Sequence, residues 1–273
     1  MDKGINVLTK KRLEGSAVTL SFTDKYIAAM DNAYDIYLFY KDDFKVYKST
    51  KLSKTHEAGH RYTRAFSVSK ENYISLPLLG TSSSVLLHFE DGFKKIKTLK
   101  WHSADVEVSK FSDVFGYFAT GGADGKIFLY DTPTGNLILS FPTKPDYIST
   151  ISFGKKSELI AIGAFDNSVT IFDISRNILI SEFFLTDVIE GFEFFNADKN
   201  IFIITRDGYS VIFDIENKKI ISKEKNFKEW ATAIAFTEDE KFVLVGTRQK
   251  TLSILTTEDN KKVLDVKVNE LVL

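Results

Sequence analysis

The sequence predicts an all-β fold built from six copies of one four-stranded unit. A Phe recurs near the end of the first apolar run of each copy, with separations of 44, 45, 42, 41 and 42 residues. These marker residues are Phe22, Phe66, Phe111, Phe153, Phe194 and Phe236. A second apolar run, a turn with Gly, Asp or Asn, and a third run follow each marker. A repeat of ~40–45 residues is the period of a propeller blade, so we expect a β-propeller with six recognisable four-stranded blades.

Residues 147–187 show how one copy predicts four strands. The segment YISTISF alternates polar and apolar residues, as in a half-buried strand, and LIAIGA is a continuous apolar run typical of a strand covered on both faces. FDN is a tight-turn tripeptide, and SVTIFD is a β-branched third strand. SRN then turns the chain, and ILISEFF is the outer strand. One such sheet cannot cover its own faces, so it needs neighbours on both sides.

The six copies follow one another along the chain, and we expect residues 1–273 to form a single domain. The predicted blades lie near residues 15–57, 58–101, 102–145, 146–187, 188–229 and 230–268. Residues 4–9 (GINVLT) are similar to residues 135–140 (GNLILS), an outer strand, so we expect them to close the ring. Residues 269–273 (NELVL) are typical of the start of an innermost strand. Six blades with a spare N-terminal strand, or a partial seventh blade built from the termini, are both open.

Several positions keep the same offset from the marker Phe. Thirteen residues after it stand Asp124, Asp166 and Asp207, with Gln249 in the sixth copy. The third strands end in Tyr40-Lys41, Phe89-Glu90, Tyr130-Asp131, Phe172-Asp173, Phe213-Asp214 and Leu255-Thr256. We expect the turn Asp to occupy equivalent turns between second and third strands. We expect the strand-end Asp to accept hydrogen bonds in the turn that follows.

These repeats resemble the WD-repeat (WD40) β-propeller family across nearly the whole chain. Three third-strand dipeptides look like the Trp-Asp of that family with another aromatic residue in place of Trp: Tyr130-Asp131, Phe172-Asp173 and Phe213-Asp214. Gly59-His60 looks like its Gly-His. His102 falls at a similar place in the third copy. The resemblance implies a hydrogen bond between His102 and Asp124. It also implies a divergent member, because no third strand carries Trp.

The composition excludes several classes of function. The chain carries 36 basic and 37 acidic side chains, so no global charge favours nucleic acid or an anionic membrane. It has no Cys, which excludes disulfides, thiolate metal sites and thiol nucleophiles. No apolar stretch has the length of a signal peptide or a transmembrane helix. We therefore expect a cytoplasmic protein without membrane insertion.

One segment matches a zinc-protease motif, H-E-x-x-H, at residues 56–60 (HEAGH). In that motif two His residues one helical turn apart bind zinc, and the Glu acts as a general base. The chemistry requires a helix, but the flanking segments KLSKT and RYTRAFSVS have no helical apolar period. The remaining His residues, His88 and His102, fall in a third strand and an inter-blade loop. We therefore expect His56 and His60 in an inter-blade turn, with no metal and no cofactor bound.

The loops that precede the innermost strands break the repeat, and they are the predicted binding site. Six residues before each marker stand Ser16, His60, Asp105, Tyr147, Val188 and Trp230. We expect these loops at the mouth of the propeller channel, where aromatic residues and Arg are typical interface anchors. The predicted protein-binding residues are Arg61, Tyr62, Arg64, Asp105, Glu107, Tyr147, Glu190, Arg206, Trp230 and Arg248. Burial of Trp230 and Tyr147 between blades is the alternative interpretation.

The predicted function is a non-catalytic scaffold that binds another protein or a peptide through these loops. The first alternative is a hydrolase or metalloenzyme on the same fold, using the HEAGH segment or a channel-mouth carboxylate. The second is an RNA or membrane-surface adaptor that uses a Lys-rich rim at residues 41–54, 94–100 and 218–228. We expect most of these Lys residues on outer strands, where Lys protects a sheet edge against aggregation.

Overall fold

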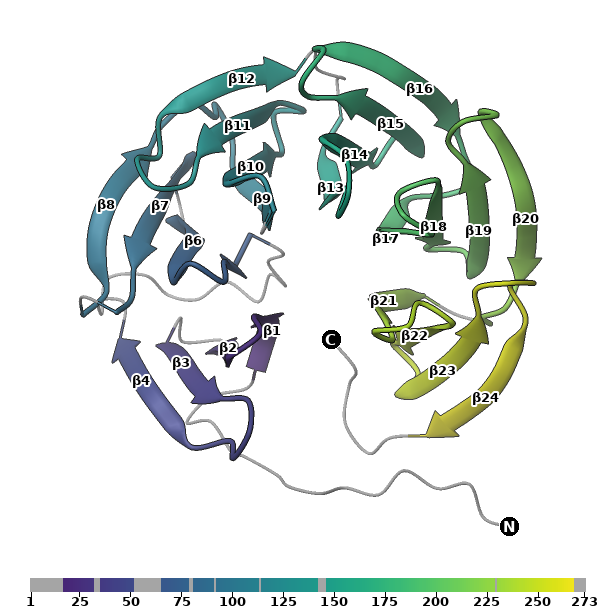
Figure 1. Cartoon of the computed structure of the whole chain (residues 1–273), viewed down its shortest axis with the longest axis horizontal. Coiled ribbons are helices and arrows are strands. Elements are labelled where there is room, and N and C mark those ends of the chain that lie inside the picture. Colours follow the sequence, from purple (N-terminus) through teal and green to yellow (C-terminus); the bar gives the residue numbers. More distant parts are fainter. Residues whose placement is uncertain are drawn as a thin grey trace. The chain divides into compact units, whose positions relative to one another are not determined.

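The computed structural model is all-β (Figure 1). It describes residues 17–31, 35–51, 65–78, 81–90, 92–112, 114–141, 146–228 and 230–267. These residues form 24 strands in six four-stranded antiparallel sheets, and they contain no helix. The predicted fold class is confirmed, since the sheets are the six blades of a β-propeller. Residues 4–9 and 269–273, which the sequence assigns to closure or to a seventh blade, lie outside the described residues.

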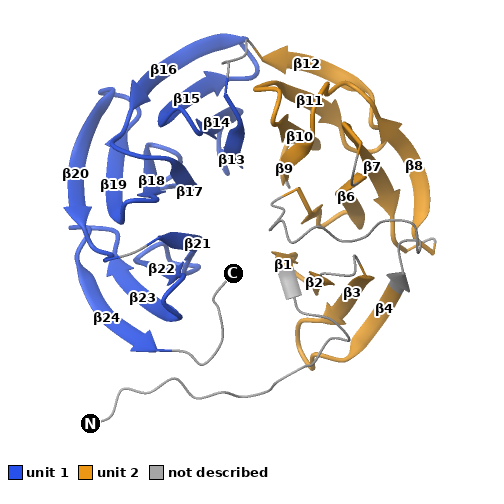
Figure 2. Cartoon of the chain, turned by 180° about the vertical axis from the view of Figure 1, so that it is seen from behind, with its two compact units in different colours: residues 1–5, 146–273 blue, residues 6–145 orange. Residues whose placement is uncertain are grey.

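The chain forms two compact units of three blades each, and each unit is described by itself (Figure 2). The unit of residues 6–145 holds blades one to three: β1 (Ala17–Phe22), β2 (Tyr26–Asp31), β3 (Asp35–Tyr40), β4 (Val46–Lys51); β5 (Ser67–Val68), β6 (Tyr73–Leu78), β7 (Ser83–His88), β8 (Lys94–Leu99); β9 (Val106–Ser112), β10 (Tyr117–Gly122), β11 (Ile127–Asp131), β12 (Leu137–Phe141). The unit of residues 1–5 and 146–273 holds blades four to six: β13 (Ile148–Phe153), β14 (Leu159–Ala164), β15 (Ser168–Asp173), β16 (Ile178–Phe184); β17 (Ile189–Phe195), β18 (Asn200–Thr205), β19 (Tyr209–Asp214), β20 (Lys219–Lys225); β21 (Ala231–Phe236), β22 (Phe242–Thr247), β23 (Thr251–Thr256), β24 (Lys262–Lys267).

Every blade is a meander in which consecutive strands are neighbours. In each blade the register between the third and fourth strands shifts near the end of the third strand. The shifts fall at Phe39, Leu87, Tyr130, Phe172, Phe213 and Leu255. A β-bulge of this kind bends the strand that carries it and increases the local twist. Figure 1 accordingly shows the outermost strands, such as β16 and β20, as curved ribbons.

The turns between second and third strands are equivalent in the blades where the sequence predicts a shared Asp. These residues are Asp124, Asp166 and Asp207. The next residue has left-handed backbone in four blades, with φ of 69° at Gly125, 69° at Asn167, 89° at Gly208 and 60° at Lys250. Gly208 has a second constraint, because a Cβ there would lie 2.2 Å from the carbonyl oxygen of Phe227. The predicted phase of the repeat is confirmed.

The Asp residues that end the third strands accept hydrogen bonds in the following turn, also as predicted. Asp173 accepts from the Arg176 N–H at 2.9 Å and from the Ser175 hydroxyl at 2.6 Å. Asp214 accepts from the N–H and the Nδ2 of Asn217, both at 2.9 Å. The recurrence of these carboxylates therefore serves the turns of the fold.

The expected half-burial of the first strand of blade four is wrong. All residues of β13 are buried, including the polar ones. Ser152 is 0% exposed, and its hydroxyl donates to a carboxylate oxygen of Glu193 in β17 at 3.1 Å. β17 is the innermost strand of the next blade and lies beside β13 (Figure 2). The polar side of β13 thus faces another blade instead of solvent. The alternation of polar and apolar residues along this strand therefore reflects two kinds of buried contact, one polar and one apolar.

The apolar core lies between adjacent blades of a unit. One cluster joins Ala161, Val169 and Ile171 of blade four to Phe194 and Phe213 of blade five. The marker residues contribute to such packing, and the buried ones are Phe66, Phe111, Phe153 and Phe194. Neighbouring sheets of a unit therefore cover each other's faces, as expected for a repeat that cannot fold alone.

Candidate protein-binding face

Backbone hydrogen bonds tie the turn between second and third strands to the loop before the innermost strand of the same blade. In blades three to six, the turn residue twelve positions after the marker donates its N–H to that loop. The bonds are Ala123 N to Asp105 O (2.8 Å), Phe165 N to Tyr147 O (2.9 Å), Arg206 N to Val188 O (2.9 Å) and Arg248 N to Trp230 O (3.0 Å). Loop and turn are therefore held together at one end of each blade, which positions the side chains they carry.

In blades four to six these loops and turns form the Arg–aromatic row, which consists of Tyr147, Phe165, Arg206, Trp230 and Arg248. The rings of Tyr147 and Phe165 pack edge to face, with centroids 5.8 Å apart. The guanidinium carbon of Arg206 lies 5.0 Å from the Phe165 centroid and 4.3 Å from the Trp230 centroid. That of Arg248 lies 3.6 Å from the Trp230 centroid. Because aromatic faces attract guanidinium groups, the row is stabilised by its own contacts.

Glu190 fixes the position of Arg206 within the row. Its side chain is 3% exposed and accepts a hydrogen bond from Arg206 Nε at 2.7 Å. A buried carboxylate requires such a partner, and a charge-assisted bond is stronger than a neutral one. The sequence predicts Glu190 as a binding residue, but its burial places it behind Arg206 and away from solvent.

Most of the row is accessible to solvent. Tyr147 is 49% exposed and Phe165 is 39% exposed, so the alternative that Tyr147 is buried between blades is wrong. Arg248 is exposed, and Trp230 is partly buried against the two Arg side chains. The sequence analysis missed Phe165. Its offset from its marker equals that of Arg206 and Arg248, and this shared offset is the signal that identifies it.

The remaining predicted binding residues are not part of the row. Asp105 and Glu107 belong to blade three, in the other unit, where Asp105 is exposed and Glu107 is partly buried. Arg61, Tyr62 and Arg64 lie outside the described residues. The contribution of these five residues to binding stays a prediction.

Blade three contains the hydrogen bond that the family resemblance implies. His102 Nδ1 lies 2.9 Å from Asp124 Oδ1, and Nε2 lies 2.8 Å from the Thr120 hydroxyl oxygen. The Thr120 hydroxyl is 3.4 Å from the hydroxyl of Tyr130. Burial lowers the pKa of His102, so the ring is neutral near pH 7. Because a carboxylate only accepts, Nδ1 carries the proton and donates to Asp124, and Nε2 accepts from Thr120.

This network has a structural role. Thr120 is 0% exposed, so no substrate reaches its hydroxyl despite the Thr–His–Asp sequence of contacts. Burial raises the pKa of Tyr130 to about 12, which keeps the phenol protonated. A Cβ on Gly122 would lie 2.5 Å from His102 Nδ1, so the close approach of the ring requires Gly at this position. The network therefore ties the loop of blade three to its turn.

We expect the free energy of unfolding to fall as the pH is lowered below about 7, because of His102. Burial holds its folded-state pKa below the ordinary value, whereas His in an unfolded chain takes up a proton near about pH 6.5. The unfolded state binds more protons in this range, so the free energy of unfolding falls as the pH falls. Urea unfolding at several pH values checks this. His102→Asn should be less stable than wild type at neutral pH but flatter across the range, and parallel curves would contradict the assignment.

Comparison with known proteins agrees with this geometry. Residues 93–131, which contain His102, Asp124 and Tyr130-Asp131, match the family described as WD domain, G-beta repeat. WD repeat-containing protein 1 from Gallus gallus is 31% identical over 108 residues, which are 38% of this chain and 18% of that protein. The third blade thus matches a WD repeat, and the chain is similar to WD-repeat proteins over part of its length.

A second similar protein matches a comparable share of the chain. Cleavage stimulation factor subunit 50 from Arabidopsis thaliana is 33% identical over 91 residues, which are 29% of this chain and 21% of that protein. The matched segments thus span about a fifth of the length of each relative.

The alternative functions depend on sites that only partly fall on the described residues. The described residues contain no group of three or more His, Cys, Asp or Glu side chains that could hold a metal ion. They also contain no helix long and apolar enough to cross a membrane. The HEAGH segment, with His56 and His60, lies outside them, so its assignment to an inter-blade turn stays a prediction. Of the Lys-rich segments, residues 94–99 and 219–225 form the outermost strands β8 and β20, as expected.

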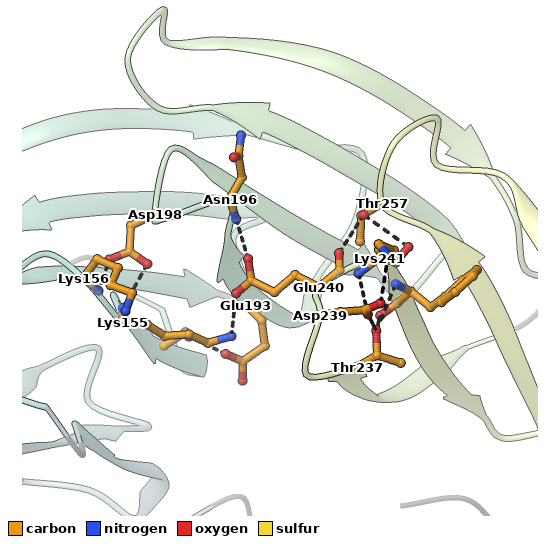
Figure 3. Close-up of polar contacts among 12 residues, drawn as sticks. Lys155, Lys156, Glu193, Asn196, Asp198, Thr237, Asp239, Glu240, Lys241 and Thr257 are labelled. Carbon is orange, nitrogen blue, oxygen red and sulfur yellow. Dashed lines mark hydrogen bonds and ion pairs between the residues drawn. The ribbon is translucent and has the colours of Figure 1, made fainter.

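In the unit of residues 1–5 and 146–273, a second set of contacts lies at the end of the strands opposite to the Arg–aromatic row (Figure 3). These contacts were not predicted from the sequence. The carboxylate of Asp198 in blade five accepts three backbone N–H groups of blade four. They belong to Lys155 (2.9 Å), Lys156 (2.5 Å) and Ser157 (2.8 Å). The donors precede the acceptor by 41 to 43 residues. No local pattern could therefore reveal the pairing.

Glu240 repeats this arrangement one blade later. Its carboxylate accepts the Asn196 N–H at 2.8 Å and pairs with Lys155 Nζ at 3.3 Å (Figure 3). Asp198 and Glu240 both have left-handed backbone, with φ of 63° and 56°. A cavity of about 420 Å³ lies beside Glu240, but neighbouring groups already engage the carboxylates of Asp239 and Glu240 that line it. The contacts at this end of the strands therefore join adjacent blades.

Proposed function

We propose that this protein is a non-catalytic scaffold that binds another protein or a peptide through the Arg–aromatic row. The observation that supports this most directly is a preformed row of three aromatic rings and two guanidinium groups across three adjacent blades. Trp, Tyr and Arg dominate the binding energy at protein interfaces. A cytoplasmic localisation, expected from the sequence, belongs to the same proposal.

The proposed mechanism is the rigid display of side chains. Each loop of the row is tied to its turn by a backbone hydrogen bond, and Arg206 is held by two rings and by Glu190. Side chains that already occupy their binding conformation lose little entropy when a partner docks. Tyr147 and Phe165 supply apolar contact area, and Arg248 supplies an exposed charge.

We expect Trp230→Ala to weaken partner binding by about 2 kcal/mol or more, because Trp230 supports both Arg side chains of the row. A pull-down with the intact chain identifies partners, and calorimetry then measures their affinity for each variant. Trp101→Ala is the matched control, because Trp101 is 55% exposed and belongs to the other unit. The control variant should bind like wild type.

Two outcomes would contradict the proposal. Normal binding by Trp230→Ala together with an earlier unfolding midpoint would make Trp230 a packing residue between blades. An equal loss of binding with Trp101→Ala would place the site away from the row.

A further inference from the structure

We propose that the partner presents a short acidic segment, with adjacent Asp or Glu carboxylates that bind Arg206 and Arg248. The inference rests on the proposed function and names the chemistry of the partner. The two Arg residues contact the same indole, that of Trp230, from the turns of blades five and six. They therefore form one local site within the row.

Among the residues that the structure describes, the guanidinium groups of Arg206 and Arg248 have unused hydrogen-bond donors. A guanidinium carries five N–H donors. Arg206 uses Nε for Glu190, and its terminal nitrogens make no hydrogen bond within the described residues. The Arg248 guanidinium contacts the Trp230 ring and forms neither a hydrogen bond nor an ion pair in that part of the chain. Planar donor pairs of this kind match the two oxygens of a carboxylate.

Other cations of the same unit differ from Arg248, because they pair with acids of the protein itself. Lys155 pairs with Glu240 at 3.3 Å, and Arg176 pairs with Asp173 at 3.7 Å. Both of these cations lie at the other end of the strands, where acids of the protein itself satisfy them. Arg248 has an aromatic support instead of an acid, so a partner can supply the missing anion.

The charges around the row favour a small anion over a continuous chain of phosphates. Glu190 offsets the charge of Arg206, so Arg248 is the uncompensated cation of the pair. Asp146 and Asp187 lie in the loops of the same face, where they accept backbone N–H groups. A continuous phosphate backbone would bring many charges next to these carboxylates. An acidic pair on a peptide places its charge only at the two guanidinium groups, and apolar residues beside it can pack on Tyr147 and Phe165.

A random peptide library displayed on phage, selected on the intact chain and then screened on Trp230→Ala, tests the inference. Peptides that need Trp230 are synthesised with a fluorophore, and their affinity is measured by anisotropy. We expect adjacent acidic residues in these peptides. Changing the acids to Asn or Gln should weaken binding by about tenfold or more.

The matched protein variants are Arg248→Gln and Arg176→Gln. Arg248→Gln should weaken the binding of the acidic peptides by about tenfold or more. It should leave the unfolding midpoint unchanged, because the side chain of Arg248 is exposed. Arg176→Gln removes an exposed Arg from the turn at the other end of the strands and should bind like wild type. Arg248→Lys should recover only part of the affinity, since an ammonium cannot bind a carboxylate through a planar pair of donors.

The outcomes separate this inference from the proposed function. Trp230-dependent peptides that lack acids, or that bind Arg248→Gln as tightly as wild type, would overturn the acidic partner and leave a protein-binding row. Tighter binding of a version with phosphoserine in place of the acidic pair would replace carboxylate by phosphate. If the chain binds oligo-dT through Arg248 and no acidic peptide binds, the ligand is a nucleic acid and not a peptide. If the selection yields no peptide whose binding depends on Trp230, both proposals are wrong.

Discussion

We expect Phe194→Ala to lower the free energy of unfolding by about 3–5 kcal/mol. Phe194 is 0% exposed and packs in the cluster that joins blades four and five. Alanine would remove most of an aromatic side chain from that cluster, and neighbouring sheets collapse only partly around the cavity. Urea denaturation followed by circular dichroism measures the change.

Phe184→Ala is the matched control for this prediction. Phe184 ends the outermost strand β16 and is 62% exposed, so removing its ring leaves no cavity in the core. The free energy of unfolding should change by about 0.5 kcal/mol or less. A small effect at Phe194, comparable with that at Phe184, would show that the marker Phe does not carry the contact between blades.

We expect Asp198→Ala to lower the free energy of unfolding by about 3 kcal/mol. Asp198 is 5% exposed, and its carboxylate accepts the backbone N–H groups of Lys155, Lys156 and Ser157. Alanine would leave three donors of blade four without their acceptor and would break the tie to blade five. The same urea denaturation measures the loss.

Two further variants sharpen the test of Asp198. Asp198→Asn keeps one acceptor oxygen, so it should fall between wild type and the alanine variant. Asp239→Ala removes a carboxylate whose side chain is 52% exposed and should leave the unfolding midpoint close to that of wild type. If Asp198→Ala unfolds like Asp239→Ala, the contacts of Asp198 do not hold the blades together.

The repeat was predictable from the sequence, and so was part of the candidate site. Asp124, Asp166 and Asp207 occupy the expected turns, because turn chemistry depends on residues that are neighbours in the chain. Tyr147 and Trp230 were predicted as places where the repeat fails, and Arg206 and Arg248 as turn residues on the same face. The structure brings the four residues into one row. How they meet could not be predicted, because Arg206 of blade five links the row by contacting Phe165 of blade four and Trp230 of blade six.

The sequence by itself determined six recognisable copies of the repeat, the four strands in each and the end of each blade that carries variable loops. Those features follow from apolar periodicity and turn residues within about 40 residues of chain. Only the tertiary structure decided that Glu190 is buried behind Arg206, that β13 is covered on both faces, and that Asp198 binds the preceding blade. Each of these depends on a neighbouring strand or blade whose position, and hence whose effect on burial and hydrogen bonding, is set by the packing of the sheets.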